Sequence, residues 1–271
     1  MFLDILGNSI YYEIHGTGIP IVTIHGFSVD HNLMKGFIEK IIPRDNYQRI
    51  YFDLPGMGKT IIKNQIFNAE QMYNTIKCFI SELVGNKRYL LIGESYGGYL
   101  MRKIIKDEPQ KILGAMFVCP LIIPEIEKRN LPERKIIYNN ISDGNIIESE
   151  LYKCFIDSAV FSTEETLKEF EKDIFVGIKN GNDKHLSTYY EKGYSFIENV
   201  DDIVFPFDNP TLFIVGRQDH CVGYKDLNIV SGNYSRASIC IIDEAGHNLQ
   251  IEKTKIVEVL TLDWLDRVNR K

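Results

Sequence analysis

The sequence predicts an α/β fold in which a mostly parallel central sheet of about eight strands is covered by helices and carries an inserted helical cap. Short apolar runs of strand length alternate with segments of helical periodicity, which is typical of parallel sheets. The runs are apolar almost throughout, as expected where helices cover both faces of the sheet. This alternation stops in one long segment near the middle of the chain and resumes after it.

The predicted strands are apolar runs bounded by turn residues. Phe2–Leu6 and Ile10–Ile14 flank Gly7-Asn8, and this arrangement predicts an opening β-hairpin. We expect the remaining strands to lie parallel in one sheet. These strands are Ile19–Ile24, Arg49–Asp53, Tyr89–Gly93, Ile112–Cys119, Thr211–Val215 and Ala237–Asp243.

Helices between these strands are predicted from their apolar stripes. For the first helix Asn68 is a good N-cap, and Gln71 stands where a capping box needs it. A second helix begins right after Ser95 and ends at about Asp107, because a proline follows. The last helix covers about Ile251–Val268 and has apolar side chains at helical spacing. We expect all of these stripes to pack against the sheet.

The long segment that interrupts the alternation is predicted to be a cap. It covers residues 121–206, and a connection of this length is not expected to lack structure inside a compact domain. Strands resume after it, which favours an insertion over a separate C-terminal domain. We therefore expect a core formed by residues 1–120 and 207–271, with residues 121–206 inserted between two of its strands.

Inside the predicted cap the pattern is helical. Apolar residues recur at helical spacing over Ile146–Val160 and over Glu164–Ile178. Ser162 and Glu165 predict a capping box at the start of the second of these helices.

Composition limits the partners and the location of the chain. The 271 residues include 37 acidic and 31 basic side chains, spread without blocks of like charge. Binding of nucleic acid needs clustered Lys and Arg, so we expect no nucleic-acid partner.

The longest apolar runs fall short of the ~20 residues that span a bilayer, and the first residues do not resemble a secretory signal. The five cysteines form no CxxC pair, which is typical of reduced thiols. We expect a cytoplasmic protein without membrane contact, either a monomer or a homodimer.

One hexapeptide carries the strongest chemical signal. Gly93-Glu94-Ser95-Tyr96-Gly97-Gly98 follows an apolar run and precedes a helical stripe. This is the G-x-S-x-G nucleophile elbow, in which a strained turn between strand and helix exposes the serine hydroxyl. Small residues on both sides of the serine avoid clashes with the neighbouring chain. The start of the helix also directs N–H groups toward the space beside the hydroxyl. We therefore predict Ser95 as a nucleophile.

A serine hydroxyl needs a base and an orienting acid, and candidates for both follow predicted strands. Asp219 follows one strand late in the chain, and His247 follows the next. Loops after parallel strands lie at the carboxyl edge of the sheet, where open α/β folds bind ligands. The chain order Ser95, Asp219, His247 therefore predicts nucleophile, acid and base at one edge.

Two other patterns predict sites less well. Asp53–Thr60 ends in Gly-Lys-Thr, but Asp53 stands where a phosphate-binding loop needs its first glycine. His25 and His31 lack the spacing and the additional ligands of a zinc site. We therefore expect neither a metal ion nor an organic cofactor.

Several motifs in this order resemble those of the α/β-hydrolase superfamily in its capped form. The resemblance covers nearly the whole chain and implies that the backbone N–H groups of Phe27 and Tyr96 form an oxyanion hole. Within the superfamily the chain resembles the esterases, the carbon–carbon bond hydrolases and the iminopeptidases. The motifs are His25-Gly26-Phe27, Asp53-Leu54-Pro55-Gly56-Met57-Gly58, Gly93–Gly98, Gly216–Asp219 and Gly246-His247.

A serine at the elbow favours acyl transfer through an acyl-enzyme. We expect a small-molecule substrate, namely an ester, thioester or lactone, as in a carboxylesterase. Carbon–carbon bond hydrolysis and aminopeptidase activity are alternatives within the same fold, and a ligand-binding receptor or scaffold without hydrolysis is an alternative of another class. The residues expected to contact the substrate are His25, Glu94, Cys221 and Val222.

Overall fold

A computed structural model describes residues 1–142 and 144–270 and places eight strands in one sheet. Each predicted strand of the core is present, with boundaries that differ from the prediction by two residues at most. The strands are β1 (Phe2–Ile5), β2 (Asn8–His15), β3 (Ile19–Ile24), β4 (Tyr47–Phe52), β5 (Tyr89–Glu94), β6 (Ile112–Val118), β9 (Thr211–Gly216) and β10 (Ala237–Ile242).

The sheet has the order β1-β2-β4-β3-β5-β6-β9-β10. β1 pairs antiparallel with β2, and β2 pairs antiparallel with β4, whereas the pairs from β4 to β10 are parallel. The prediction of a mostly parallel sheet of about eight strands is therefore confirmed. Because the parallel strands run in one direction, the loops that follow β3, β5, β6, β9 and β10 meet at one edge.

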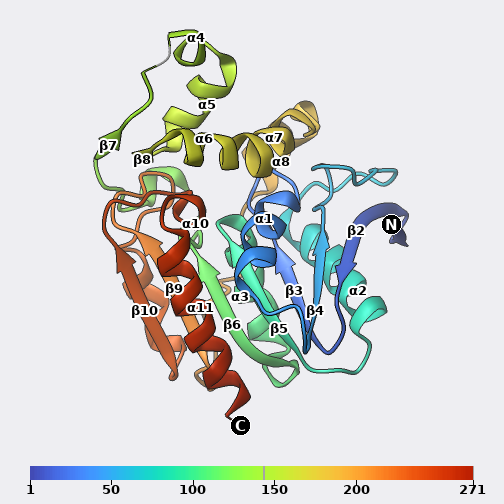
Figure 1. The fold of residues 1–271 in the computed structure, drawn as a ribbon. Helices are drawn as coiled ribbons and strands as arrows, with labels where there is room; N and C mark the ends of the chain where they lie inside the picture. Colours follow the sequence, from blue (N-terminus) through green and yellow to red (C-terminus); the bar gives the residue numbers. More distant parts are fainter. Residues whose placement is uncertain (143, 271) are drawn as a thin grey trace.

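Helices cover both faces of this sheet, as Figure 1 shows. α1 and α11 contact each other on one face, and α2 and α3 contact each other on the other. The predicted last helix is divided in two near Lys253. The helices of the core are α1 (Asn32–Ile41), α2 (Ala69–Val84), α3 (Tyr96–Asp107), α9 (Leu227–Val230), α10 (Leu249–Glu252) and α11 (Thr254–Asn269), with short 3₁₀ turns η1 (Pro109–Lys111) and η4 (Ser231–Asn233). The 3₁₀ turn η2 (Ile126–Lys128) belongs to the segment between β6 and β9.

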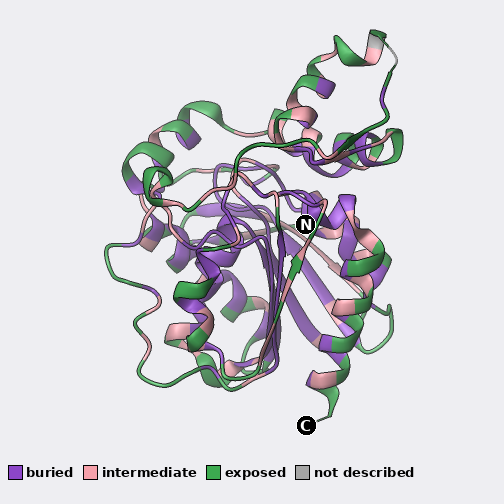
Figure 2. Cartoon of the chain, turned by 90° about the vertical axis from the view of Figure 1, so that its left-hand side faces the viewer, coloured by how far each residue is buried: buried purple, intermediate pink, exposed green. Residues whose placement is uncertain are grey.

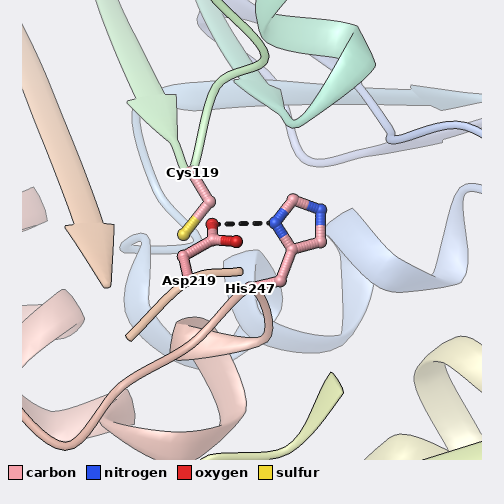
Figure 3. Close-up of side chains that lie close together, drawn as sticks. All are labelled: Cys119, Asp219 and His247. Atoms are coloured by element: carbon pink, nitrogen blue, oxygen red, sulfur yellow. Dashed lines mark hydrogen bonds and ion pairs between the residues drawn. The ribbon is translucent and has the colours of Figure 1, made fainter. Parts of the chain in front are cut away.

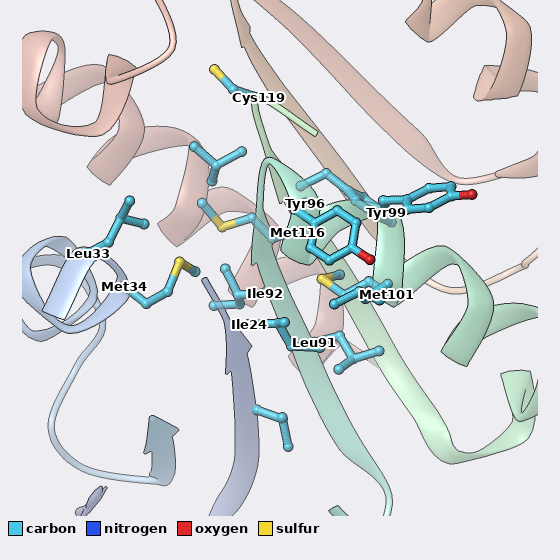
Figure 4. Close-up of a cluster of buried hydrophobic side chains, with 14 of the residues drawn as sticks. Ile24, Leu33, Met34, Leu91, Ile92, Tyr96, Tyr99, Met101, Met116 and Cys119 are labelled. Atoms are coloured by element: carbon cyan, nitrogen blue, oxygen red, sulfur yellow. The ribbon is translucent and has the colours of Figure 1, made fainter. Parts of the chain in front are cut away.

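The core lies between the sheet and these helices. The strands in the middle of the sheet are buried on both faces, whereas the outer faces of the helices are exposed (Figure 2). Figure 4 shows side chains of α1, β3 and β5 meeting those of α3 and β6, with Ile24, Ile92 and Met116 at the centre. On the face that α1 and α11 cover, Trp264 of α11 is fully buried, and its indole N–H donates to the carbonyl of Pro210 at 2.9 Å.

The start of α2 matches the predicted capping box only in part. The Asn68 side chain accepts from the N–H of Gln71 at 3.0 Å, as expected of an N-cap. The Gln71 side chain, however, accepts from the N–H of Phe67 at 2.7 Å instead of the N–H of Asn68. Both side chains still satisfy N–H groups at the helix entry, which is the physical role of a capping box.

The segment between β6 and β9 consists mainly of helices above the carboxyl edge of the sheet (Figure 1). The first predicted helix is divided into α4 and α5, whereas the second is one continuous helix over residues 164–179 that contains a π-helical turn. α8 was not predicted. The elements are β7 (Tyr138–Asn139), α4 (Gly144–Ile147), α5 (Glu150–Ser158), β8 (Phe161–Ser162), α6 (Glu164–Phe170), the π-helical turn η3 (Glu171–Phe175), α7 (Val176–Lys179) and α8 (Asp183–Gly193).

The predicted capping box at Ser162 and Glu165 is wrong by one residue. Ser162 belongs to β8 and pairs with Asn139. The N-cap of α6 is Thr163, whose hydroxyl accepts from the N–H of Thr166, while the Thr166 hydroxyl accepts from the N–H of Thr163. The short β-pair fixes Ser162 in an extended strand, so the helix begins after the next residue.

Candidate active site

The turn after β5 holds Ser95 in a strained conformation. Ser95 has φ 50° and ψ −118° and lies directly before α3. Its N–H donates to the carbonyl of Val118 at 3.1 Å, and its carbonyl accepts from the N–H of Leu121 at 2.9 Å. A positive φ is costly for a residue with a Cβ and persists only where the surroundings fix it. The backbone at the end of β6 provides these surroundings, so the neighbouring strand fixes the turn.

Asp219 and His247 lie beside each other, although 28 positions separate them. Nδ1 of His247 is 2.9 Å from Oδ2 of Asp219, as Figure 3 shows. The other carboxylate oxygen of Asp219 accepts from the N–H groups of Cys221 at 2.9 Å and Val222 at 3.1 Å. These contacts fix the carboxylate and leave it directed at the imidazole.

The second ring nitrogen of His247 faces Glu94. Nε2 of His247 is 3.2 Å from Oε1 of Glu94, and the Glu94 side chain is buried. Ser95 and His247 line the same cavity, but within the described residues the Ser95 hydroxyl makes no hydrogen bond to the imidazole. In structures without substrate, such hydrogen bonds are often long and shorten only when the substrate binds.

The charges of these three side chains shift one another's pKa. Burial alone raises the pKa of Asp219, but the positive charge of His247 and the donated hydrogen bonds hold it below its usual value. Burial raises the pKa of Glu94 to about 7. Burial lowers the pKa of His247, but the charges of Asp219 and Glu94 outweigh this and raise it to about 9.

The two residues predicted to form an oxyanion hole lie close to each other. The rings of Phe27 and Tyr96 are 5.8 Å apart, edge to face. Tyr96 is the first residue of α3, and N–H groups in the first turn of a helix have no acceptor within that helix. The Tyr96 hydroxyl meets that of Tyr189 of α8 at 2.6 Å, so this side chain joins the elbow to the segment above it.

A cavity of about 140 Å³ lies between Ser95 and the helices above it. Its floor carries the candidate nucleophile and base, and its roof is formed by α5, α6, η3 and α7. Most of the roof is apolar. The residues that line the cavity are Gly26, Phe27, Val29, Leu33, Glu94, Ser95, Cys154, Ser158, Phe170, Ile174, Ile178, His247 and Asn248.

Three predicted substrate contacts lie outside the lining of this cavity. His25 is buried, its Nε2 accepts from the N–H of Leu54 at 2.9 Å, and its Nδ1 lies 2.7 Å from the carbonyl oxygen of Gly26. The ring therefore joins the loop after β3 to the loop after β4. Cys221 and Val222 contact Asp219 through their backbone N–H groups. Glu94, by contrast, does line the cavity.

Sequence reasoning missed other residues of the site. Asn248 lines the cavity and donates to the Ser158 hydroxyl at 2.8 Å. Glu252 is buried in α10, and its carboxylate accepts from the N–H of Gly246 at 2.6 Å and from that of Val160 at 2.7 Å. No motif marks Glu252. The sequence does show an acidic residue soon after Gly246-His247, in a predicted helix that packs against the core, and this was the available signal.

Cys119 completes the group of side chains drawn in Figure 3. Sγ of Cys119 and the ligand atoms of Asp219 and His247 lie within 4.8 Å of one another, a spacing that a metal ion could use. Burial raises the pKa of the thiol well above its usual value, so it stays protonated, and Nδ1 of His247 already pairs with Asp219. A cysteine binds a metal ion as its thiolate and a histidine through a free ring nitrogen, and neither is present in this contact, which does not favour a metal ion here.

A larger hollow, of about 910 Å³, lies at the other end of the sheet. It is lined by the beginnings of β3 and β4 and by the C-terminal part of α11, and its described lining includes no Ser, Cys or His. Because the described lining of this hollow has no serine or cysteine beside a histidine, we place the candidate site at the smaller cavity beside Ser95.

The fold and the geometry at the carboxyl edge define an α/β-hydrolase. The model of the alpha/beta hydrolase fold family matches residues 19–254, and the chain belongs to this family. The resemblance inferred from the motifs, and with it the predicted hydrolase fold, is confirmed.

The chain is similar to proteins of known function over most of its length. It is 24% identical to a pimeloyl-[acyl-carrier protein] methyl ester esterase of Legionella pneumophila over 88% of this chain and 92% of the relative. It is 23% identical to the mouse monoacylglycerol lipase ABHD6 over 92% of this chain and 76% of the relative.

Solved structures have the same fold. An alpha/beta superfamily hydrolase from Oenococcus oeni is 27% identical, with a TM-score of 0.89 and 99% of both chains covered. An esterase from Thermogutta terrifontis is 18% identical, with a TM-score of 0.69, 99% of this chain and 98% of that chain covered. Among the described residues, no helix has the length and apolar character needed to cross a membrane.

Proposed function

We propose that the chain is a serine ester hydrolase that acts through an acyl-enzyme on a compact, uncharged substrate. The main support is that Nδ1 of His247 lies 2.9 Å from Oδ2 of Asp219 and that His247 and Ser95 line the same cavity. Two of its curated relatives are named an esterase and a lipase, which supports ester chemistry.

In the proposed reaction the Ser95 hydroxyl attacks the carbonyl carbon and His247 accepts its proton. Asp219 holds Nδ1 and stabilises the imidazolium that forms. The N–H groups of Phe27 and Tyr96 donate to the oxyanion, and each such donor contributes about 2.7–4 kcal/mol in well-studied enzymes. His247 then protonates the leaving oxygen, and a water molecule, activated by the same imidazole, releases the acid.

The cavity supports a short acyl group or a small lactone. An apolar cavity of about 150 Å³ accommodates a molecule the size of benzene, and this one measures about 140 Å³. Among the described residues of its lining there is no Lys or Arg, and Glu94 adds a carboxyl group. The one basic side chain of the described lining is His247, which the proposed reaction uses as its base, and this favours an uncharged acyl chain.

We propose further that residues 121–206 act as a cap over the core of residues 1–120 and 207–271. Phe170 and Ile174 of this segment cover the cavity from above. The hydroxyl contact between Tyr96 and Tyr189 supports the same arrangement from the other end of the segment.

Labelling with a fluorophosphonate tests the nucleophile. We expect the wild-type chain to form one adduct, located on Ser95 by peptide mass, because the attack on phosphorus needs the same base and oxyanion donors. The Ser95→Ala variant serves as the blank and is expected to remain unlabelled. A folded wild-type chain without an adduct would favour the ligand-binding receptor or scaffold. Labelling without turnover of any p-nitrophenyl ester would favour the carbon–carbon hydrolase or the aminopeptidase.

A chain-length series tests the proposed acyl pocket. We expect kcat/KM of the wild-type chain to fall by about tenfold or more from p-nitrophenyl butyrate to the octanoate, because excluded methylenes lose that much in a closed pocket. Phe170→Ala enlarges the cavity and is expected to restore much of the octanoate rate.

Leu167→Ala is the matched control for this series. Leu167 is buried in the same helix, α6, but does not line the cavity. The Leu167→Ala variant loses core packing, as Phe170→Ala does, and the free energy of unfolding is expected to fall by about 2–5 kcal/mol. The substitution does not widen the pocket. Equal wild-type values of kcat/KM for the butyrate and the octanoate would contradict the compact pocket.

A further inference from the structure

Glu94 occupies one fixed position beside the candidate base. Its side chain is buried, and the N–H of Gly26 donates to its carboxyl group. A Cβ at Gly26 would lie 3.3 Å from the carboxyl carbon of Glu94 and far inside the contact distance of its Oε2. Because residue 26 has no Cβ, the Glu94 carboxyl group can occupy this space. In this position the carboxyl group is directed at His247.

The nitrogen that Glu94 contacts is the nitrogen that Ser95 needs. Nδ1 of His247 is held by Asp219, so only Nε2 can accept the serine proton. Nε2 lies 3.2 Å from Oε1 of Glu94, an ion-pair distance at which the two side chains share the binding of one proton. That proton sits on Nε2 in an imidazolium–carboxylate pair and on Oε1 in an imidazole–carboxylic acid pair. In the imidazolium form Nε2 has no lone pair that could accept the Ser95 proton.

We propose that Glu94 is a positioning residue that retains a proton on the His247–Glu94 pair, and that Ser95 becomes reactive only after this proton has left for solvent. The inference rests on the proposed roles of Ser95 and His247. Release leaves a neutral imidazole and a carboxylate, and no covalent bond to carbon changes in this step. Nε2 then accepts the Ser95 proton while Oγ bonds to the carbonyl carbon, and it returns that proton to the leaving oxygen.

Some charged groups around the His247–Glu94 pair raise its pKa values, and others lower them. The negative charge of Asp219, in the loop after β9, raises the pKa of both His247 and Glu94. Arg129, whose guanidinium donates to the carbonyl of Cys221 at 2.8 Å, lowers that of His247. The thiols of Cys119 and Cys221 are neutral, because burial raises the pKa of both. The carboxylates outweigh the guanidinium, so the pair keeps its proton above the pH at which a free imidazole loses it.

Glu94→Gln tests the proposal through the pH dependence of kcat/KM for p-nitrophenyl acetate. Glutamine has the same shape and still accepts the Gly26 N–H, but it carries no charge. An opposite charge at this distance shifts a pKa by about 1–3 units. We expect the midpoint of the acidic limb to fall by about one pH unit or more. The plateau at high pH should also fall, because the imidazolium formed during attack loses a stabilising charge.

Two further variants complete this experiment. Glu94→Asp keeps the charge but withdraws the carboxylate from Nε2 by one methylene, so its midpoint should lie between the other two. Glu70→Gln is the matched control, because Glu70 also accepts a backbone N–H, that of Ile197 at 2.7 Å, but lies on α2. The control is expected to keep the wild-type midpoint. Identical midpoints for the wild-type chain, Glu94→Gln and Glu94→Asp would overturn the proposal.

A readout without substrate separates this inference from the proposed function. The His247 ring can be titrated by NMR in the wild-type chain and in Glu94→Gln, and the midpoint is expected to be lower in the variant by about one pH unit or more. If no ester is turned over, the proposed function fails while this titration still tests Glu94. Equal ring midpoints would mean that Glu94 does not hold the proton.

Discussion

Asp219→Asn is expected to lower kcat for p-nitrophenyl acetate by about 10⁴-fold with the fold intact, the size of effect measured for the equivalent change in serine proteases. The Asn oxygen can still accept from the N–H groups of Cys221 and Val222, which keeps the loop in place. Its amide nitrogen then faces Nδ1 of His247 as a donor, so the imidazole must carry its proton on Nε2. In that tautomer the ring cannot accept the serine proton.

The controls for this prediction separate loss of activity from loss of structure. Circular dichroism and the thermal midpoint should match those of the wild-type chain. Asp202→Asn, at an exposed position before β9, is expected to keep the wild-type kcat. A near-normal rate in Asp219→Asn would assign the orienting role to another carboxylate, and Glu94 is the one already in contact with the ring.

Gly97→Ala is expected to lower the stability of the fold and to abolish fluorophosphonate labelling as well. A Cβ at this position would lie 2.7 Å from the carbonyl carbon of Ile24 and 2.8 Å from the carbonyl oxygen of His25, with the oxygen of Ile24 nearer still. These are backbone atoms at the end of β3, so relief requires α3 and the strand to separate. Overpacking of this kind costs about 1–3 kcal/mol or more, which lowers the melting temperature by several degrees.

Calorimetry and labelling measure the two consequences of this substitution together. Gly232→Ala is the matched control, because nothing lies within 4 Å of the added Cβ there. It should leave both readouts unchanged. If Gly97→Ala melts at the wild-type temperature and still labels, the close approach of the elbow to β3 is not required for the site.

Much of the fold was predictable because the signals are local. The buried strands of a parallel sheet are apolar throughout, and β9 and β10 were recognisable from a few residues each. The turn at Ser95 was recognisable for the same reason, since the glycines around it follow from steric limits within six residues. Candidate acid and base could be placed at one edge because chain direction in a parallel sheet fixes which loops meet.

What the sequence could not predict depends on side-chain packing between distant segments. The contact between Glu94 and His247 depends on the direction of two side chains, and Glu94 was expected to contact substrate instead. α8 was missed because its exposed face is strongly polar, so its apolar stripe is short. Phe170 and Ile174 carry a helical pattern that is the same whether they fill the cap or line a cavity. Such choices are made by tertiary packing.

Glu252 gives the site a mechanical property. Its carboxylate accepts hydrogen bonds from two separate segments of the chain. One donor is the N–H of Gly246, next to the candidate base, and the other is the N–H of Val160, shortly after α5. Movement of either partner leaves a buried oxygen without its donor, which is costly. The segment at Val160 and the loop that carries His247 therefore depend on the same buried carboxylate, so one side chain ties the roof of the cavity to the candidate base.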